Sequence, residues 1–473
     1  MRKSVPASAV PKAWLVLIAA LTMIVFEGAF RKWVPPFQEG IGKYMMYFSK
    51  DIIFAMILFL PVRSAPMVAL KVFQKWLWPG CALMVIGAFL SSLHGFSLAG
   101  AMLTARACIV LPILALLAVP RLAGLPLHRV ALLLAAFTIL NFALGVEQNR
   151  LASDNILNRY SDANIEVVTE DTGVRATGTF SYITGMSIIC AVGIWAGMVL
   201  MSLAVKQWQR IGAWVTLAAS FGCGLASISR APIVIGVAMI GGWLTASKDG
   251  LSVLARGLVI GTCCLVAAMA LGLSTTFAEL GQGLMQRSDR AGDSFSDRAF
   301  GQLDEMVTAI QEAPLGEGFG THQAAAYYVS NGNVELSRIE SQLPRMVLET
   351  GFLGLIGYLM VCAGGILALQ KAKREAPSSG TRAALLATQM FLLPMFYALV
   401  IFDHTASAFV WMILAAVLGA AEMQPNQKLK IETLKVEKGN EQEAAKQFGR
   451  RTPKFGRAIY PATATQSVGI TKT

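Results

Sequence analysis

The stretch LVIGTCCLVAAMALGL, residues 258–273, runs for sixteen residues without a charged side chain. A strand of a membrane β-barrel alternates apolar and polar residues, and this run does not, so we expect it to form a helix. It is part of the apolar segment 254–273, which has the length of about 20 residues that a helix needs to cross a bilayer. The chain is therefore predicted to be an all-α polytopic integral membrane protein.

Similar apolar segments recur through most of the chain. Of its 473 residues, 55% are hydrophobic and 14% are charged, whereas soluble domains carry about 25% charged residues. We predict about 12 transmembrane helices, over 13–30, 44–60, 76–93, 101–119, 130–146, 181–204, 211–227, 231–246, 254–273, 346–370, 383–402 and 406–421.

The basic residues set the predicted orientation. An even number of spans puts both termini on one side, and the short connections predicted inside are all basic, as the positive-inside rule requires. The segments predicted outside carry ten arginines and two lysines, and the tail after Glu422 carries ten basic residues. We therefore expect a multi-pass protein of the bacterial inner (cytoplasmic) membrane with both termini in the cytoplasm.

Two domains are predicted. Residues 1–422 form the transmembrane domain, with long periplasmic loops at 147–180 and at 274–345, the latter between helices 9 and 10. Residues 423–473 form a basic cytoplasmic tail that is expected to be disordered and to contact anionic lipid headgroups. Nucleic-acid binding is not expected, because no recognisable binding fold accompanies the tail.

The second long loop has an internal order. Apolar residues recur at helical spacing from Ser296 to Glu312, which predicts a helix there. Pro314 then ends the helix, and LGEGFGTHQ (315–323) follows with three glycines. A helix that lies across the membrane face, followed by a glycine-rich turn, is suited to cover a binding site.

Arginines dominate the face predicted outside. Arg175, Arg230, Arg298 and Arg345 come from separate parts of the chain, yet each is predicted near the outer interface. Arginine grips phosphate in a two-point fork, whereas lysine acts as a point charge. The four are predicted to bind a pyrophosphate; the alternative is that each guanidinium extends singly to the lipid headgroups.

Several residues could remove a proton from an attacking hydroxyl. His322, in the glycine turn, and Glu340 are the candidate catalytic bases, and a surface role for His322 is the alternative. Secondary candidates lie at or within spans: Asp403, His404, Lys50 and Asp51. Lys50 has a structural alternative as the partner of Glu27.

Metal chemistry and cofactors are not expected. The aspartates of the second loop recur every four residues rather than in the paired D-x-D form of a metal-dependent nucleotide-sugar site. All seven cysteines lie in apolar segments, which indicates neither a disulfide framework nor a zinc site.

Short motifs, in their order along the chain, resemble the O-antigen ligase and O-antigen polymerase superfamily of bacterial membrane glycosyltransferases. They cover residues 175–360, and the polymerase-like features FEGAFRKW and SKD precede them. The motifs are RATGTF (175–180), SISR (227–230), the loop helix near Arg298, PLGEGFG (314–320), LETGFLG (348–354), FEGAFRKW (26–33) and SKD (49–51).

The resemblance implies a function. Such proteins take a glycan from an undecaprenyl-pyrophosphate carrier at the periplasmic face and pass it to an acceptor hydroxyl, without a metal. Arg175, Arg230 and Arg298 match the arginines that contact phosphate in the family. Many ligases carry a histidine shortly before an E-x-G-x-x-G motif, which reads ETGFLG (349–354) in this chain. The stretch before it reads RIESQ (338–342) here and contains no histidine. That departure favours a polymerase of lipid-linked repeat units, for exopolysaccharide or O-antigen, over a ligase.

Two other functions stay open. A ligase would pass finished glycan to lipid A core or to protein, and a polysaccharide flippase or permease would use the ionisable residues within the spans, Lys50, Asp51 and Arg106. The expected partners are the undecaprenyl-pyrophosphate-linked glycan and membrane lipid, with a chain-length regulator and a flippase implied by the resemblance alone.

Overall fold

The computed structural model describes residues 12–38, 40–62, 68–161, 169–170, 173–246, 295–322, 342–398 and 404–421. The predicted span 254–273, the remainder of the second loop and the tail 423–473 lie outside these residues. The α-helices are α1 (Lys12–Trp33), α2 (Gly40–Ala55), α3 (Val68–Ser92), α4 (Leu98–Ala105), α5 (Leu111–Ala118), α6 (Leu127–Arg150), α7 (Ile183–Leu203), α8 (Gln207–Ala226), α9 (Arg230–Ala246), α12 (Phe295–Glu312), α14 (Gln342–Glu375), α15 (Ser379–Ala398) and α16 (His404–Ala421).

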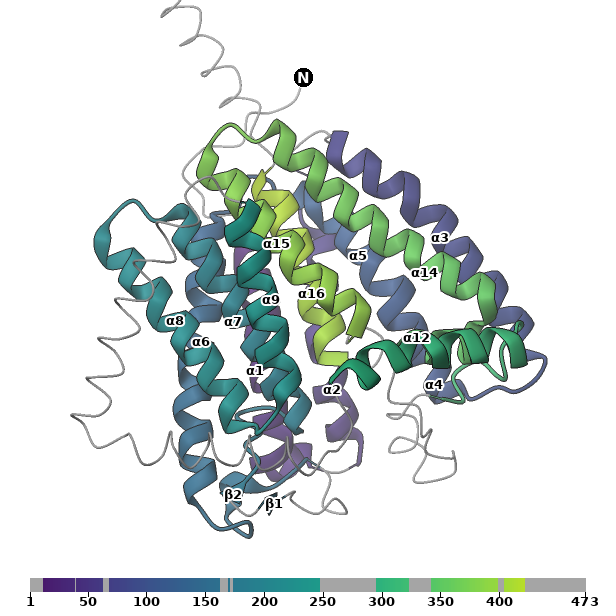
Figure 1. Ribbon diagram of the computed structural model, residues 1–473, viewed down its shortest axis with the longest axis horizontal. Coiled ribbons are helices and arrows are strands. Elements are labelled where there is room, and N and C mark those ends of the chain that lie inside the picture. Colours follow the sequence, from purple (N-terminus) through teal and green to yellow (C-terminus); the bar gives the residue numbers. More distant parts are fainter. Residues whose placement is uncertain are drawn as a thin grey trace, which may run out of the picture. The chain divides into compact units, whose positions relative to one another are not determined.

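Each of the other eleven predicted apolar segments coincides with a helix (Figure 1). By length and composition, seven helices of the described part of the chain can cross a membrane: α1, α3, the continuous helix Leu98–Arg121, α6, α7, α14 and α16. The helix over Ala231–Ala246 is apolar but shorter. The chain therefore has the predicted architecture of a helical membrane protein.

One small sheet interrupts the helical pattern. Within the first long loop, β1 (Thr169–Glu170) pairs antiparallel with β2 (Gly173–Val174), with Thr169 opposite Val174. The all-α prediction omitted this pair because two-residue strands leave no alternating pattern in a sequence.

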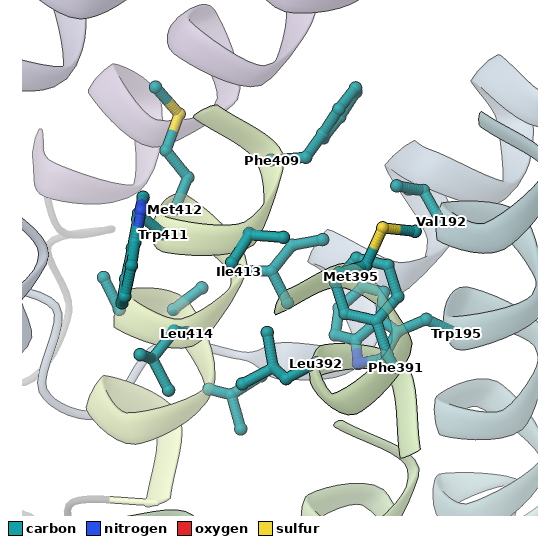
Figure 2. Close-up of a cluster of buried hydrophobic side chains, with 14 of the residues drawn as sticks. Val192, Trp195, Phe391, Leu392, Met395, Phe409, Trp411, Met412, Ile413 and Leu414 are labelled. Atoms are coloured by element: carbon teal, nitrogen blue, oxygen red, sulfur yellow. The ribbon is translucent and has the colours of Figure 1, made fainter. Parts of the chain in front are cut away.

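Helix α16 lies at the centre of the core. It is apolar on every side, and its residues from Ala406 to Gly419 are buried, as expected of a helix surrounded by other helices. Figure 2 shows Phe409 and Ile413 of α16 on the side that faces Phe391 of α15 and Trp195 of α7. The Trp195 indole donates a hydrogen bond to Thr388 Oγ1 at 3.0 Å, so its one polar group is satisfied inside this core.

Helices α3 and α14 run side by side, and small residues let their backbones approach closely (Figure 1). A Cβ atom added at Gly80 of α3 would lie 2.7 Å from the Gly357 carbonyl oxygen of α14. Lipid provides no hydrophobic force that would favour one helix pair over another, so close packing of this kind has to hold the two together.

Helix α14 is broken near its beginning, at Gly351. This residue has φ 65° and ψ −175°, a backbone conformation that is essentially restricted to glycine. The break frees the Leu348 carbonyl, which accepts hydrogen bonds from the backbone N–H groups of Glu317 at 2.7 Å and Gly318 at 3.3 Å. The glycine turn after α12 is thereby docked against the first part of α14.

Helix α12 fulfils the prediction made for Ser296–Glu312, and Pro314 follows its end. It packs against α14 and crosses its neighbours instead of running along them (Figure 1). Met306, Ala309 and Ile310 face the core, whereas Leu303 and Val307 are exposed. The apolar face predicted for this helix is thus divided between the core and the surface.

Candidate functional site

The turn that follows α12, residues 313–322, is fixed at both of its sides. Besides its contacts with α14, the backbone of Phe319 donates to the Gly95 carbonyl at 3.0 Å and accepts from the N–H of Ser97 at 3.1 Å. Gly95 and Ser97 lie between α3 and α4. The turn therefore has a defined position above the ends of three transmembrane helices, and it contains His322.

His322 and Glu317 form a pair within this turn. The distance from His322 Nε2 to Glu317 Oε2 is 3.0 Å. Burial lowers the pKa of His322 below its usual value; the Glu317 carboxylate opposes this shift, and Arg345 adds to it. The imidazole is therefore neutral at pH 7 and donates its proton from Nε2 to Glu317. Nδ1 then carries the lone pair that a general base needs.

Arg345 lies in the buried first part of α14, near two histidines. Its side chain is 1% exposed, and its charge acts both on His322 and on His404, the first residue of α16. One turn further along α14, Glu349 accepts a hydrogen bond from Thr104 of α4. Three predicted site residues from distant parts of the chain, His322, Arg345 and His404, are thus brought near one another.

A second group of charges surrounds the ring of Tyr47 in α2. The distances from the ring centroid are 4.5 Å to Lys50 Nζ, 5.6 Å to Arg31 Cζ and 5.9 Å to Arg106 Cζ. The ring of His404 meets Tyr47 edge to face, with 5.5 Å between the centroids. We call these five residues, together with Glu27 and Asp51, the Tyr47 cluster.

Two carboxylates offset part of the charge in the Tyr47 cluster. Asp51 accepts a two-point hydrogen bond from Arg106, through Nε and, at 2.8 Å, through Nη2. Glu27 accepts from Lys50 and also, at 3.1 Å, from Arg31. The alternative interpretation of Lys50 as a partner of Glu27 is therefore correct, and Glu27 also pairs with Arg31.

Arg106 begins a widened helical turn. Residues Arg106–Val110 form a π-helix between α4 and α5, and such turns occur often at functional sites. The Ala107 carbonyl in this turn accepts a hydrogen bond from the indole of Trp411 at 3.0 Å, which ties the turn to α16. The irregular backbone is thus held in place next to the Tyr47 cluster.

Arg175 belongs to a different part of the same domain. Its Nε donates to the Ser227 carbonyl and its Nη2 to Ser229 Oγ, both at 3.0 Å. This fork holds the SISR turn between α8 and α9, in which Ile228 has a φ of 49°. The structure thus brings together two motifs of the resemblance, RATGTF and SISR.

The RATGTF segment is buried in a polar network. Gln148 Oε1 accepts from the backbone N–H groups of Thr177 at 3.0 Å and Gly178 at 2.8 Å, and Asn141 Oδ1 accepts from that of Thr179 at 2.8 Å. Lys32 donates to Thr177 Oγ1 at 2.9 Å and to the Gly178 carbonyl at 2.7 Å. The first long loop therefore ends in a buried, hydrogen-bonded turn.

Other predicted site residues are described less fully. Arg230 begins α9 and Arg298 lies in the first turn of α12, but their side chains lie outside the description, as do Glu340 and Asp403 entirely. Within the described ranges, no three His, Cys, Asp or Glu side chains form a group that could hold a metal ion.

Sequence reasoning missed Glu317 and Tyr47 as site residues. Glu317 stands five residues before His322 among three glycines, so a turn that folds back on itself was a usable signal. Tyr47 gave no such signal, because an aromatic residue in an apolar helix is ordinarily part of the core.

No protein-family model matches the chain, and no curated protein matches its sequence.

Proposed function

We propose that the chain is a polymerase of undecaprenyl-pyrophosphate-linked oligosaccharide repeat units, acting without a metal at the periplasmic face of the bacterial inner membrane in exopolysaccharide or O-antigen synthesis. The observation that carries the proposal is the neutral His322, paired with Glu317 and standing near the buried Arg345. A base beside a fixed cation suits the transfer of a sugar from a diphosphate.

In the proposed reaction, an acceptor hydroxyl oxygen attacks the anomeric carbon of the growing glycan. The new C–O bond forms while the bond from that carbon to the diphosphate breaks, and the diphosphate keeps the electron pair. The hydroxyl proton passes to His322 Nδ1, and Glu317 stabilises the resulting imidazolium. Arg345, with Arg175, Arg230 and Arg298, neutralises the charge on the leaving diphosphate.

A ligase is the second candidate, because it uses the same chemistry with a lipid A core or protein acceptor. The departure at RIESQ (338–342) from the histidine of many ligases favours the polymerase. A permease is the third candidate, and the ionisable residues Lys50, Asp51 and Arg106 within the helices favour it.

The test is to replace His322 with Gln and to analyse the glycans of a strain that has only this copy. We expect loss of polymer and accumulation of single carrier-linked units on the periplasmic side, with normal amounts of protein in the membrane. The matched control is the double variant Lys371→Gln/Glu375→Gln, which removes an ion pair at the far end of α14. Polymer of normal length from His322→Gln would refute the assigned base, whereas units accumulating in the cytoplasm would favour the permease.

A further inference from the structure

The Tyr47 cluster contains polar groups that its own residues leave unsatisfied. His404 is 7% exposed, and neither of its ring nitrogens has a hydrogen-bond partner in the part of the chain that the structure describes. Nη1 of Arg106 is likewise buried without a partner there, while Nε and Nη2 of the same guanidinium hold Asp51. A buried polar group without a partner is unfavourable, and more so when it is charged.

The charges of the cluster also do not cancel. Arg31 and Lys50 share the one carboxylate of Glu27, so this triad carries an excess positive charge. Asp51 is already engaged by the two-point contact with Arg106. An uncompensated charge is unfavourable at a place where Lys50 and Arg106 are 0% and 6% exposed.

Three cations lie near His404. Lys50, Arg106 and Arg345 lie close enough to act on its ring electrostatically. The unsatisfied groups of Arg106 and His404 therefore belong to one cluster around the Tyr47 ring.

We propose that the Tyr47 cluster is a binding site for a phosphate-type oxyanion, held by Arg106 Nη1 and the His404 imidazole and attracted by Lys50. An oxyanion accepts hydrogen bonds and supplies negative charge, so it meets both needs of the cluster at once. The site differs from the diphosphate grip assigned to Arg175, Arg230, Arg298 and Arg345, and the inference does not require that the chain be a polymerase.

The phosphate could belong to a diphosphate or to a lipid headgroup, and two measurements separate these sources. The first titrates inorganic pyrophosphate into the purified full chain in a phosphate-free maltoside detergent, with binding followed by calorimetry. The second determines the phospholipid phosphorus that stays with the protein after extensive washing.

Two variants probe the site. His404→Asn keeps a polar side chain but changes its reach, and Arg106→Gln/Asp51→Asn removes the guanidinium together with its own counter-charge, so that no bare carboxylate remains. Lys371→Gln/Glu375→Gln is the control, because it removes one charge of each sign from a half-exposed pair elsewhere. Melting temperature and helix content are recorded for each variant. If one of the two site variants misfolds, the other still tests the site.

We expect both site variants, but not the control, to weaken pyrophosphate binding at least about tenfold. A loss of retained phosphorus in both, without any pyrophosphate binding to the unaltered protein, would assign the anion to a lipid headgroup. Unaltered protein and site variants that behave alike in both measurements would overturn the proposal. Because neither measurement needs turnover, anion binding by a protein that makes no polymer would refute only the proposed function.

Discussion

His322 Nε2 lies 3.0 Å from Glu317 Oε2, and the two residues stand five positions apart in one turn whose backbone is fixed to α14. This relationship gives Glu317 a positioning role, because it selects the tautomer in which Nδ1 accepts a proton. The pair also makes the pH dependence of the proposed reaction predictable.

Activity should be full at neutral pH and should fall as the pH drops through the pKa of His322. This pKa lies below the ordinary histidine value, and the base works only when it is neutral. Glu317→Gln removes the carboxylate that raises the pKa, so the acidic limb of the pH–rate profile should move to lower pH. Arg345→Gln removes a cation that lowers the pKa, so the limb should move to higher pH.

The measurement is polymer formation in membrane fractions between about pH 5 and pH 8. All buffers have the same ionic strength, because salt screens the effects of charge. Both variants should also be slower than the unaltered protein. If the acidic limb of the pH–rate profile lies at the same pH in both variants as in the unaltered protein, His322 does not set the pH dependence.

Replacement of Gly351 by Ala should destabilise the fold by about 1–3 kcal/mol and displace the glycine turn, because no other residue readily adopts its conformation. The added Cβ would also lie 2.8 Å from the Pro314 carbonyl oxygen. Gly241→Ala, in α9, is the matched control: a Cβ there meets no atom within 4 Å. The control should be neutral or stabilising by up to about 1 kcal/mol.

Thermal unfolding in detergent checks this prediction. Gly351→Ala should melt below the unaltered protein and should make less polymer even at temperatures where it stays folded, since the turn carries His322. Equal melting temperatures for Gly351→Ala and Gly241→Ala would show that the break in α14 is not needed.

Replacement of Glu27 by Gln should be more damaging than replacement of Lys50 by Met. The first change leaves two buried cations, Arg31 and Lys50, without their shared carboxylate, and the loss of one partner from a buried pair costs about 3–5 kcal/mol. The second change leaves Glu27 still paired with Arg31. The order of the two melting temperatures is the readout; a lower value for Lys50→Met would contradict the shared-carboxylate arrangement.

The helical segments could be predicted because apolar runs near the length of a bilayer crossing have few alternatives. The end of α12 was equally readable, since Pro314 cannot continue a helix. The break at Gly351 was not readable: GFLG inside an apolar run is compatible with an unbroken helix. Only the docking of the turn after α12, which depends on residues far away in the chain, requires the break.

The sequence predicts which residues belong to the candidate site better than it predicts which of them lie next to one another. No pattern in the sequence groups His322, Arg345 and His404 or indicates that Arg345 acts on both histidines. Arg175 was grouped with Arg345 as a phosphate ligand, whereas its described contacts are to the SISR turn. Side chains in different helices are brought together by packing, which no local pattern encodes.

The fork between Arg175 and the SISR turn gives a last prediction. Arg175→Lys keeps the charge but cannot contact both the Ser227 carbonyl and Ser229 Oγ, because an ammonium lacks the planar geometry of the guanidinium. Ser229→Ala removes the hydrogen bond from the Arg175 guanidinium, which contributes about 1.5–3 kcal/mol, together with the longer one that Ser229 Oγ donates to the Ser227 carbonyl at 3.2 Å. If Arg175 also contacts the diphosphate, Arg175→Lys should lower both melting temperature and polymer yield, whereas Ser229→Ala should lower mainly the melting temperature. Equal losses of polymer from the two variants would instead assign Arg175 to holding the turn alone.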